Sequence, residues 1–512
     1  MQQSSSVWIW PSIALPRRHL PWTAALAFVL PFFLYLLTLA PSIYNLDSAE
    51  LTTAVATGGI VRATGYPLYL MLGRAWSELP LGDVAYRMNL FSAFSGALTL
   101  LLVERTLARW RVGPWARLGA VGLLASATFF WALALIAEVY TLHTLLMMAL
   151  LLALLNWRAA PTPGRVGLVG LLVGLGLSHH LATGLLVPGV AWFLLATDRR
   201  ALFQFRSLLA GAGALVLGLM PYLYLSYLYT QQPAFNYAGH YNVLGQFEPV
   251  DLTTLSGLWW LVSGSSFSGS MFAYDAAGLW GELVALALQL WRDFIAVGIG
   301  PVLLGAFLLW RRDWRLAGLL SLFFLGNGLF YADYRVIDKA TMYLPNYVIW
   351  ALWLGIGLEW LLDWVASDES GPSQRRLLGA LIAVMVGVAV VVHWPLVNRS
   401  EDNSTRQTAT DILSVAEEGA LLFGWWDTIP AIEYLQLVEG ERRDVRAINR
   451  FLLPYDAFEA MVQANLGTRE IYVSGIPPLP LHPQRYEPVG EWYRIRASLP
   501  VPARPTDLSR AP

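Results

Sequence analysis

Two carboxylates follow the first hydrophobic stretch of the chain, and their type and spacing could support acid–base chemistry. Asp47 and Glu50 stand in the run Asp47-Ser48-Ala49-Glu50-Leu51. Ionisable groups beside a bilayer are costly unless they are partnered or used. The Asp-x-x-Glu spacing also fits a capping box that opens a helix through Ala56. One of these carboxylates could take a proton from an attacking hydroxyl as a general base, and both interpretations can hold at once.

A third carboxylate, Glu138, lies in a short turn between two strongly apolar stretches, in the run Ala137-Glu138-Val139-Tyr140. A carboxylate in such a place needs water or a partner. It is therefore either a solvated turn residue or a second acidic group that joins Asp47 on the same face.

His179 and His180 are adjacent at the apex of an apolar hairpin. They could be interfacial residues at the ends of two helices, or they could donate hydrogen bonds to a phosphate. The sequence has no cysteine and no run such as His-Glu-x-x-His, so it predicts no metal site and no cofactor, and leaves a metal requirement open.

Arg335, Asp338 and Lys339 precede a late apolar stretch, with Tyr343 close behind. Two cations together on a face that is poor in cations suggest a bound anion. The alternative is local charge balance with the acidic residues around them. In the run Trp425-Trp426-Asp427-Thr428, Asp427 is expected to be the N-cap of a helix.

Composition places the chain among polytopic membrane proteins. Of its 512 residues, 56% are hydrophobic and 13% are charged, with 23 Trp and a mean hydropathy of +0.51. Soluble domains carry about 25% charged residues. The net charge of −1 argues against a nucleic-acid partner, which would require a basic patch.

Apolar stretches of about 20 residues predict about eleven membrane spans. They cover roughly 22–40, 88–104, 117–136, 139–156, 166–178, 183–197, 207–229, 285–310, 316–332, 344–364 and 377–396. Whether 166–197 makes two full spans is left open. Arginines concentrate in alternate connecting segments, beginning with Arg17 and Arg18. This bias predicts a cytoplasmic N-terminus and an extracytoplasmic C-terminal tail, in a plasma or inner membrane.

The expected organisation is a transmembrane module, 1–396, followed by a small extracytoplasmic α/β domain, 397–512. The module holds a first outer loop, 41–86, and a large one, 230–284, that contains no Lys or Arg. The tail alternates predicted strands and helices: strands at 420–424, 444–448 and 470–473, and helices at 428–438 and 456–465.

At this point several runs resemble a known family, the DUF2723-type polytopic proteins of the GT-C glycosyltransferase class, which includes O-mannosyltransferases of plexin-type receptor domains. The resemblance covers nearly the whole chain and is most specific in the first 190 residues. The matching runs are Asp47 to Leu51, Gly65-Tyr66-Pro67-Leu68-Tyr69, Leu81 to Leu90 and Ala137 to Leu142, and, more weakly, Gly176 to His180, Asp338 to Pro345, Asp427 to Pro430 and Tyr434 to Gly440.

The resemblance implies an α-helical GT-C fold and an inverting transfer of a sugar, mannose among the candidates, from a polyprenyl-phosphate-linked donor to an acceptor hydroxyl on the outer face. It implies that an acidic residue of the first outer loop is the base, which places this role on Asp47. Glu50 and Glu138 are the other candidate catalytic residues. The candidate donor-binding residues are Arg62, Tyr66, His179, His180, Arg335, Asp338, Lys339 and Tyr343. Where the family has His-Pro-Pro-Gly, this chain reads Arg62-Ala63-Thr64-Gly65, so that Arg62 could meet the lipid phosphate.

The residues argue for the same arrangement, because the acidic groups, the scarce cations and the tail all fall on one predicted face. The expected partners are the lipid-linked donor, an acceptor protein, glycan or lipid, and membrane lipids. The main alternative is a transporter or lipid flippase, but inverted repeats and midplane polar sites are not evident in the sequence. A non-catalytic receptor would leave the boundary carboxylates unexplained.

Overall fold

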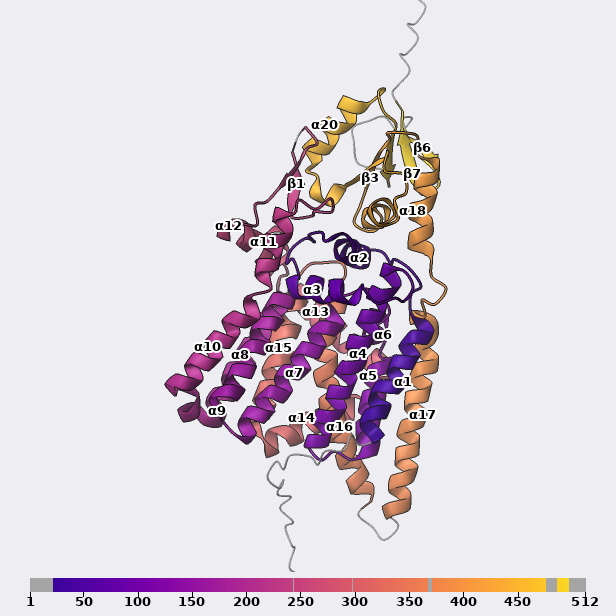
Figure 1. Ribbon diagram of the computed structural model, residues 1–512. Coiled ribbons are helices and arrows are strands. Elements are labelled where there is room, and N and C mark those ends of the chain that lie inside the picture. Colours follow the sequence, from indigo (N-terminus) through magenta and orange to yellow (C-terminus); the bar gives the residue numbers. More distant parts are fainter. Residues whose placement is uncertain (1–21, 243, 297, 367–370, 476–485, 497–512) are drawn as a thin grey trace, which may run out of the picture.

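A bundle of long helices carries a smaller part built around a β-sheet (Figure 1). The computed structural model describes residues 22–242, 244–296, 298–366, 371–475 and 486–496. Arg17 and Arg18 fall outside these residues, as does the end of the tail beyond residue 496.

The bundle confirms a mostly helical protein whose helices coincide with the predicted apolar stretches. These helices are α1 (Trp22–Thr38), α4 (Val84–Arg109), α5 (Pro114–Ser126), α6 (Thr128–Leu133), α7 (Tyr140–Ala159), α8 (Pro163–His179), α9 (Val187–Leu202), α10 (Phe205–Leu219), α11 (Tyr222–Thr230), α13 (Ala276–Asp293), α14 (Ile299–Arg312), α15 (Trp314–Ala332), α16 (Leu344–Val365) and α17 (Gly371–Val397). Within the described residues, seven helical stretches are long and apolar enough to cross a membrane. The count of about eleven spans stays a prediction.

The stretch predicted as one span over 285–310 is two helices, α13 and α14. The chain turns at Ile295 and Ala296, which both adopt positive φ. Asp293 ends α13 and is buried, and it accepts hydrogen bonds from Tyr347 (2.7 Å) and Thr128. A carboxylate that must be satisfied by neighbouring helices explains why the apolar pattern does not continue as one straight helix.

Small residues allow two helices of the bundle to pack closely. A Cβ added at Gly170 would lie 2.2 Å from the carbonyl oxygen of Gly211, so small residues let α8 and α10 touch along their backbones.

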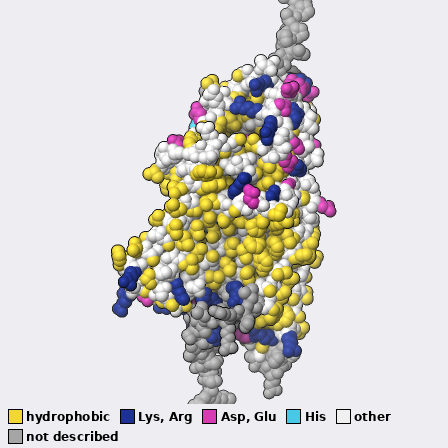
Figure 2. Space-filling view, in the orientation of Figure 1, with side chains coloured by type: hydrophobic (Ala, Val, Ile, Leu, Met, Phe, Trp, Pro, Cys, Tyr) yellow, Lys and Arg dark blue, Asp and Glu magenta, His cyan; other side chains and the backbone are white. Residues whose placement is uncertain are grey.

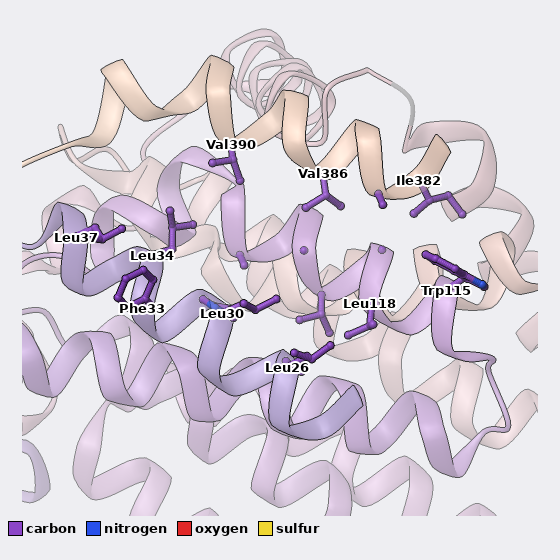
Figure 3. Close-up of a pocket in the computed structure, with 17 residues that line it drawn as sticks. Leu26, Leu30, Phe33, Leu34, Leu37, Trp115, Leu118, Ile382, Val386 and Val390 are labelled. Carbon is purple, nitrogen blue, oxygen red and sulfur yellow. The ribbon is translucent and has the colours of Figure 1, made fainter. Parts of the chain in front are cut away.

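Between α1, α5 and α17 lies a groove of about 430 Å³ (Figure 3). Its lining is entirely apolar, with Phe33, Trp115 and Val386 among the residues that frame it.

Short elements cover the upper end of the bundle. Two helices, α2 (Asp47–Thr57) and α3 (Pro67–Trp76), belong to the predicted first outer loop and lie across the bundle in Figure 1. The predicted large outer loop contains a two-stranded antiparallel hairpin of β1 (Gly239–Tyr241) and β2 (Phe247–Pro249), followed by α12 (Leu255–Val262) and the 3-10 turn η2 (Ser265–Ser270).

The tail forms a five-stranded mixed sheet in the order β4-β3-β5-β7-β6. Its strands are β3 (Leu421–Gly424), β4 (Arg446–Asn449), β5 (Ile471–Ser474), β6 (Tyr486–Val489) and β7 (Trp492–Ile495). The three predicted strands are β3, β4 and β5, which pair in parallel, whereas β6 and β7 were not predicted. The strand assigned to 444–448 begins two residues later, at Arg446.

Helices of the tail pack on both faces of this sheet. The predicted helix 428–438 is α19 (Ile429–Tyr434) continued by a π turn, η4 (Leu435–Glu439), and the helix 456–465 is α20 (Tyr455–Asn465). One face is covered by α19 and α18 (Ser404–Val415), and this core also includes Ile43 and Ala49 of the first outer loop. The other face is covered by α20. That the tail is a separate domain remains a prediction, because its core is shared with residues near α2.

Charged side chains lie above and below a broad hydrophobic band (Figure 2). We expect the lower end to be cytoplasmic and the tail extracytoplasmic, because of the arginine bias in the sequence. Topology reporters inserted at Ser370, which lies outside the described residues, and fused to the C-terminus should therefore report opposite sides of the membrane. Both reporters on one side would overturn this orientation.

Candidate active site

Asp47 and Glu50 both belong to the first turn of α2, three residues apart on one face of the helix. The predicted capping box does not form. Leu46 occupies the N-cap position with φ of 56°, and no side chain caps the helix. Instead of satisfying backbone N–H groups of α2, both carboxylates turn toward Arg62. The prediction of a helix through Ala56 is correct, since α2 ends at Thr57 with Gly58 in the left-handed conformation.

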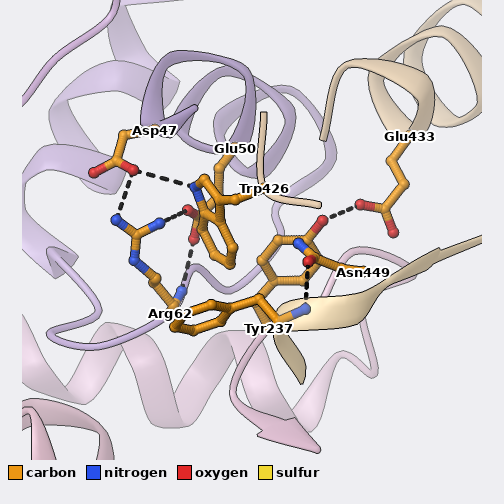
Figure 4. A network of polar contacts seen from close by, with 8 residues as sticks. Asp47, Glu50, Arg62, Tyr237, Trp426, Glu433 and Asn449 are labelled. Atoms are coloured by element: carbon orange, nitrogen blue, oxygen red, sulfur yellow. Dashed lines mark hydrogen bonds and ion pairs between the residues drawn. The ribbon is translucent and has the colours of Figure 1, made fainter. Parts of the chain in front are cut away.

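Arg62 joins the two carboxylates (Figure 4). Its Nη2 lies 2.6 Å from Asp47 Oδ1 and its Nη1 lies 3.1 Å from Glu50 Oε2. The backbone N–H of Arg62 also donates to Glu50 Oε1 at 2.7 Å. Glu50 thus accepts from both the main chain and the side chain of Arg62, whereas both hydrogen bonds that Asp47 accepts reach the same oxygen, Oδ1.

Trp426, from the loop after β3, completes the cluster. Its indole Nε1 donates to Asp47 Oδ1 at 3.2 Å, and the Arg62 guanidinium lies over its ring at 4.0 Å. Planar stacking of a guanidinium on indole adds a cation–π attraction. Asp427, the predicted N-cap, does not cap α19. Thr428 holds that position without a side-chain cap, and its hydroxyl donates to Asp427 Oδ1 at 3.0 Å.

Asp47 and Glu50 differ in how deeply they are buried, and burial also affects the pKa values of Glu50 and Arg62. The Glu50 side chain is 2% exposed and that of Asp47 is 13% exposed. Burial raises the pKa of Glu50 to about 8, and the nearby charge of Arg62 only partly offsets this. Burial alone would lower the pKa of Arg62, but Asp47 and Glu50 together raise it above its ordinary value. Arg62 therefore stays charged and is largely neutralised by its own partners.

A further carboxylate, partly buried, connects the large outer loop to the tail. Glu433 of α19 accepts a hydrogen bond from the Tyr237 hydroxyl, and the Tyr237 ring contacts that of Trp426 edge to face at 5.2 Å. Burial raises the pKa of Glu433 to about 8. Sequence reasoning missed Tyr237, Trp426 and Glu433. The run from Trp425 to Thr428 was the available signal, but its spacing alone indicated only a helix cap.

The raised pKa values of Glu50 and Glu433 predict a stability that depends on pH. Because both groups hold their protons more tightly when folded, their contribution is fully present below about pH 4.5 and is lost as the pH rises through about 8. We therefore expect the thermal unfolding temperature of the purified protein in detergent to fall between pH 5 and pH 9. Glu50→Gln and Glu433→Gln should each flatten the curve, and a wild-type curve that rises over this window would contradict the assignment.

Glu138 lies between α6 and α7 and is 8% exposed. Burial raises its pKa well above the usual range, and the charges of Asp47 and Asp338 raise it further. Its Oε2 is buried without a hydrogen-bond partner. The structure therefore brings Glu138 within electrostatic reach of Asp47, in surroundings that favour its protonated form.

The two histidines differ in their contacts. The Nε2 atom of His179 lies 2.9 Å from the Val139 carbonyl oxygen, so this nitrogen carries the proton and donates. His180 accepts the backbone N–H of Ala182 at its Nδ1. Burial lowers the pKa of His180 to about 4, so the ring is neutral and its remaining proton sits on Nε2. The Tyr66 ring lies 5.4 Å from that of His180, which places both near the start of α3.

The residues predicted at the later anion site divide into two groups. The Lys339 Nζ lies 2.6 Å from Glu282 Oε1 and donates to the Tyr274 hydroxyl at 3.0 Å. Arg335 is exposed, and its Nη2 donates to the Ala273 carbonyl at 2.6 Å. Asp338 instead interacts electrostatically with Asp47, because burial and the Asp47 charge both raise the pKa of Asp338. Tyr343 is 3% exposed with an unpartnered hydroxyl. Among the described residues, no cluster of three acidic, His or Cys side chains could hold a metal ion.

Residues 47–202 match a known family, described as the N-terminal domain of the protein O-mannosyl-transferase TMEM260. This segment begins at Asp47 and contains Glu50, Arg62, Glu138 and both histidines. Over this segment the chain resembles the TMEM260-type protein O-mannosyl-transferases. Its TMEM260-type segment thus coincides with the part of the chain that supplies most of the candidate site.

Comparisons over longer stretches of the chain match proteins of the same name. The chain is 24% identical over 452 residues to "Protein O-mannosyl-transferase TMEM260" of Mus musculus, covering 82% of this chain and 62% of the relative. It is 21% identical over 482 residues to the protein of the same name in Dictyostelium discoideum, covering 85% of this chain and 58% of the relative. The chain therefore spans about three fifths of the length of these curated relatives.

Solved structures show the fold. ArnT from Cupriavidus metallidurans bound to undecaprenyl phosphate matches with a TM-score of 0.57 and 13% identity, covering 92% of this chain and 97% of that one. Its apo state matches with a TM-score of 0.56. The GT-C type of fold expected from the sequence is confirmed.

Proposed function

We propose that this protein is a multi-pass membrane glycosyltransferase. It transfers a sugar, with mannose as the leading candidate, from a polyprenyl-phosphate-linked donor to a hydroxyl group of an acceptor protein. Transfer proceeds with inversion on the extracytoplasmic face. The observation that carries the proposal is the pair of carboxylates at the bundle boundary, of which Asp47 is held by Arg62 and Trp426 through a single oxygen.

Asp47 acts as the general base. Its Oδ1 is fixed at 2.6 Å from Arg62 and 3.2 Å from the Trp426 indole, whereas its Oδ2 accepts no hydrogen bond from the described residues. The free oxygen can take the proton of the acceptor hydroxyl while the other one orients the group. Oxygen of the acceptor then forms a bond to the anomeric carbon as the bond from that carbon to the phosphate oxygen breaks.

Glu50 positions rather than reacts, because both of its oxygens are occupied by Arg62. Burial raises the pKa of Glu138, which favours its protonated form, and its buried Oε2 has no hydrogen-bond partner among the described residues, so Glu138 can donate a hydrogen bond to the sugar or the phosphate. One site can in this way combine a base, Asp47, with a hydrogen-bond donor, Glu138.

The leaving phosphate needs donors that stabilise its developing charge. Arg62 is neutralised by Asp47 and Glu50, so it orients the base more than it binds the donor. His180 is better placed for the phosphate, since its Nε2–H remains available once Nδ1 accepts from Ala182. Tyr66, next to His180, and the cations Arg335 and Lys339 remain further donor-binding candidates.

Two comparisons support a lipid-linked donor and a protein acceptor. The structural neighbour ArnT binds undecaprenyl phosphate, and the curated relatives are named protein O-mannosyl-transferases. The apolar groove between α1, α5 and α17 also has the size and chemistry to hold a hydrocarbon chain. A transporter or flippase is less well supported, because α2, which carries Asp47 and Glu50, lies with the tail at one end of the bundle rather than at its middle.

A reconstituted transfer assay tests this function. The purified full chain in liposomes is given polyprenyl-phosphate mannose, polyprenyl-phosphate glucose or a nucleotide sugar, with a Ser- and Thr-rich polypeptide as acceptor. We expect transfer from a polyprenyl-phosphate sugar only, giving a product with the opposite anomeric configuration by NMR. A product with retained configuration, or transfer from the nucleotide sugar alone, would contradict the proposal.

A further inference from the structure

The carboxyl ends of three parallel strands meet beside the candidate active site. Gly424 of β3 pairs with Asn449 of β4, and Ser474 of β5 stands one step beyond the pair Phe423 and Val473. The three residues therefore form a row along one edge of the sheet. Because β3 is followed by β4 on one side and β5 on the other, this edge is a switch point, where open sheets containing parallel strands usually bind ligands.

Two hydrogen-bond donors at this edge lack normal partners. Asn449 is 2% exposed, and its Oδ1 accepts the backbone N–H of Phe451 at 3.0 Å. Its Nδ2 is buried beside the Tyr237 hydroxyl but makes no hydrogen bond of normal geometry to the described residues. Arg450 is 9% exposed, and the one hydrogen bond that it makes to the described residues is long, 3.5 Å, to the Ser474 carbonyl. Within the described residues it has no carboxylate partner. Buried donors of this kind are costly unless a ligand satisfies them.

Aromatic rings surround these donors and lead to Asp47. The Arg450 guanidinium lies 4.3 Å from the Trp425 ring, which is 46% exposed. Phe451, 47% exposed, contacts Trp426 edge to face at 5.1 Å, and Trp426 donates to Asp47. Figure 4 shows Asn449 and Trp426 of the tail close to Tyr237 of the large outer loop. The edge is thus partly open to solvent and continuous with the candidate base.

We propose that this edge, formed by Trp425, Asn449, Arg450 and Phe451, is the subsite that binds the acceptor polypeptide next to its reactive hydroxyl. The free polar groups are donors, which suits backbone carbonyl oxygens because these only accept. A sugar acceptor, with hydroxyls that also donate, would leave half of its hydrogen bonds unmade here. The exposed rings of Trp425 and Phe451 offer apolar contact to the side chains that flank the hydroxyl. The subsite rests on the proposed function, since it assumes an acceptor delivered to Asp47.

Equilibrium binding tests the subsite without requiring turnover. The full chain in nanodiscs is titrated against a labelled 12-residue peptide with blocked ends and a central Thr, and against a labelled oligomannoside, by fluorescence anisotropy. Asn449→Asp keeps the acceptor for the Phe451 N–H but removes the free donor, and Trp425→Ala removes an exposed ring. Arg496→Gln, at a surface ion pair with Glu487 on the distant strands, is the matched control.

We expect each of the two subsite variants to raise the peptide Kd about tenfold, the loss typical of one hydrogen bond or ring contact, and Arg496→Gln to leave it within twofold. Unchanged peptide binding in both variants, or a loss confined to the oligomannoside, would overturn the subsite. Because the Trp425 side chain is 46% exposed, Trp425→Ala should fold normally, and a thermal unfolding curve checks this. A wild-type chain that binds the peptide but transfers no sugar would count against the proposed function and leave the subsite standing.

Discussion

Asp47→Asn should yield a folded, membrane-inserted protein that has lost sugar transfer by about 10²–10⁴-fold. Asn preserves the side-chain volume and keeps one oxygen for the Trp426 indole and the Arg62 guanidinium. It cannot accept a proton at neutral pH. Since Asp47 does not cap α2, the substitution does not remove a helix cap either. The measurement is the initial transfer rate in liposomes, with protein amount normalised by thermal unfolding and size-exclusion profiles.

Glu50→Gln is the matched control for this result. Gln can still accept from the Arg62 backbone N–H through its amide oxygen, and Glu50 positions Arg62 rather than reacts. We therefore expect a smaller loss of rate than in Asp47→Asn. Equal losses in the two variants would mean that the carboxylates act as one unit, and that the base cannot be assigned to Asp47 alone.

Removal of Arg62 should have the largest effect on stability. Arg62→Met leaves Asp47 and Glu50 without their cation, and breaking a buried pair typically costs about 3–5 kcal/mol. The ring of Trp426 also loses the guanidinium that stacks on it. We expect a large drop in the thermal unfolding temperature and loss of transfer together.

A double variant separates the structural part of that effect from the chemical part. Arg62→Met combined with Glu50→Gln removes one of the stranded carboxylates, so part of the stability should return. Transfer should remain low, because Asp47 still lacks the group that orients it. A single Arg62→Met protein with normal stability would show that the ion pairs contribute little, and one with normal activity would remove Arg62 from the site.

Much of the bundle could be predicted from the sequence because apolar length and arginine bias are local signals. The helices coincide with the predicted apolar stretches, and α2 begins where Asp47 and Glu50 indicated a helix. The pairing of β3, β4 and β5 also follows from alternating strands and helices in the tail. The break between α13 and α14 could not be predicted, since it depends on Asp293 finding partners on other helices.

Only part of the candidate site could be predicted from the sequence. Asp47, Arg62 and Glu138 stand out as charges in apolar surroundings, but Trp426 lies 379 positions from Asp47 along the chain. No local pattern reveals such a contact. The spacing of Asp47 and Glu50 suggested a capping box, yet the proximity of Arg62 offers each carboxylate a charged partner, and a charge-assisted hydrogen bond is stronger than a neutral cap.

Single-turnover transfer by Asp47→Asn and Glu138→Gln, measured side by side with the wild-type chain, tests the account most directly. Burial and nearby charges raise the pKa of Glu138, which favours its protonated form, and Gln is a neutral side chain of similar shape that can still donate a hydrogen bond. We predict that Glu138→Gln keeps the chemical rate within about tenfold of the wild type, while Asp47→Asn loses about 10²–10⁴-fold. The reverse order, with Asp47→Asn near normal and Glu138→Gln inactive, would show that Glu138 is the base and that Asp47 only holds Arg62.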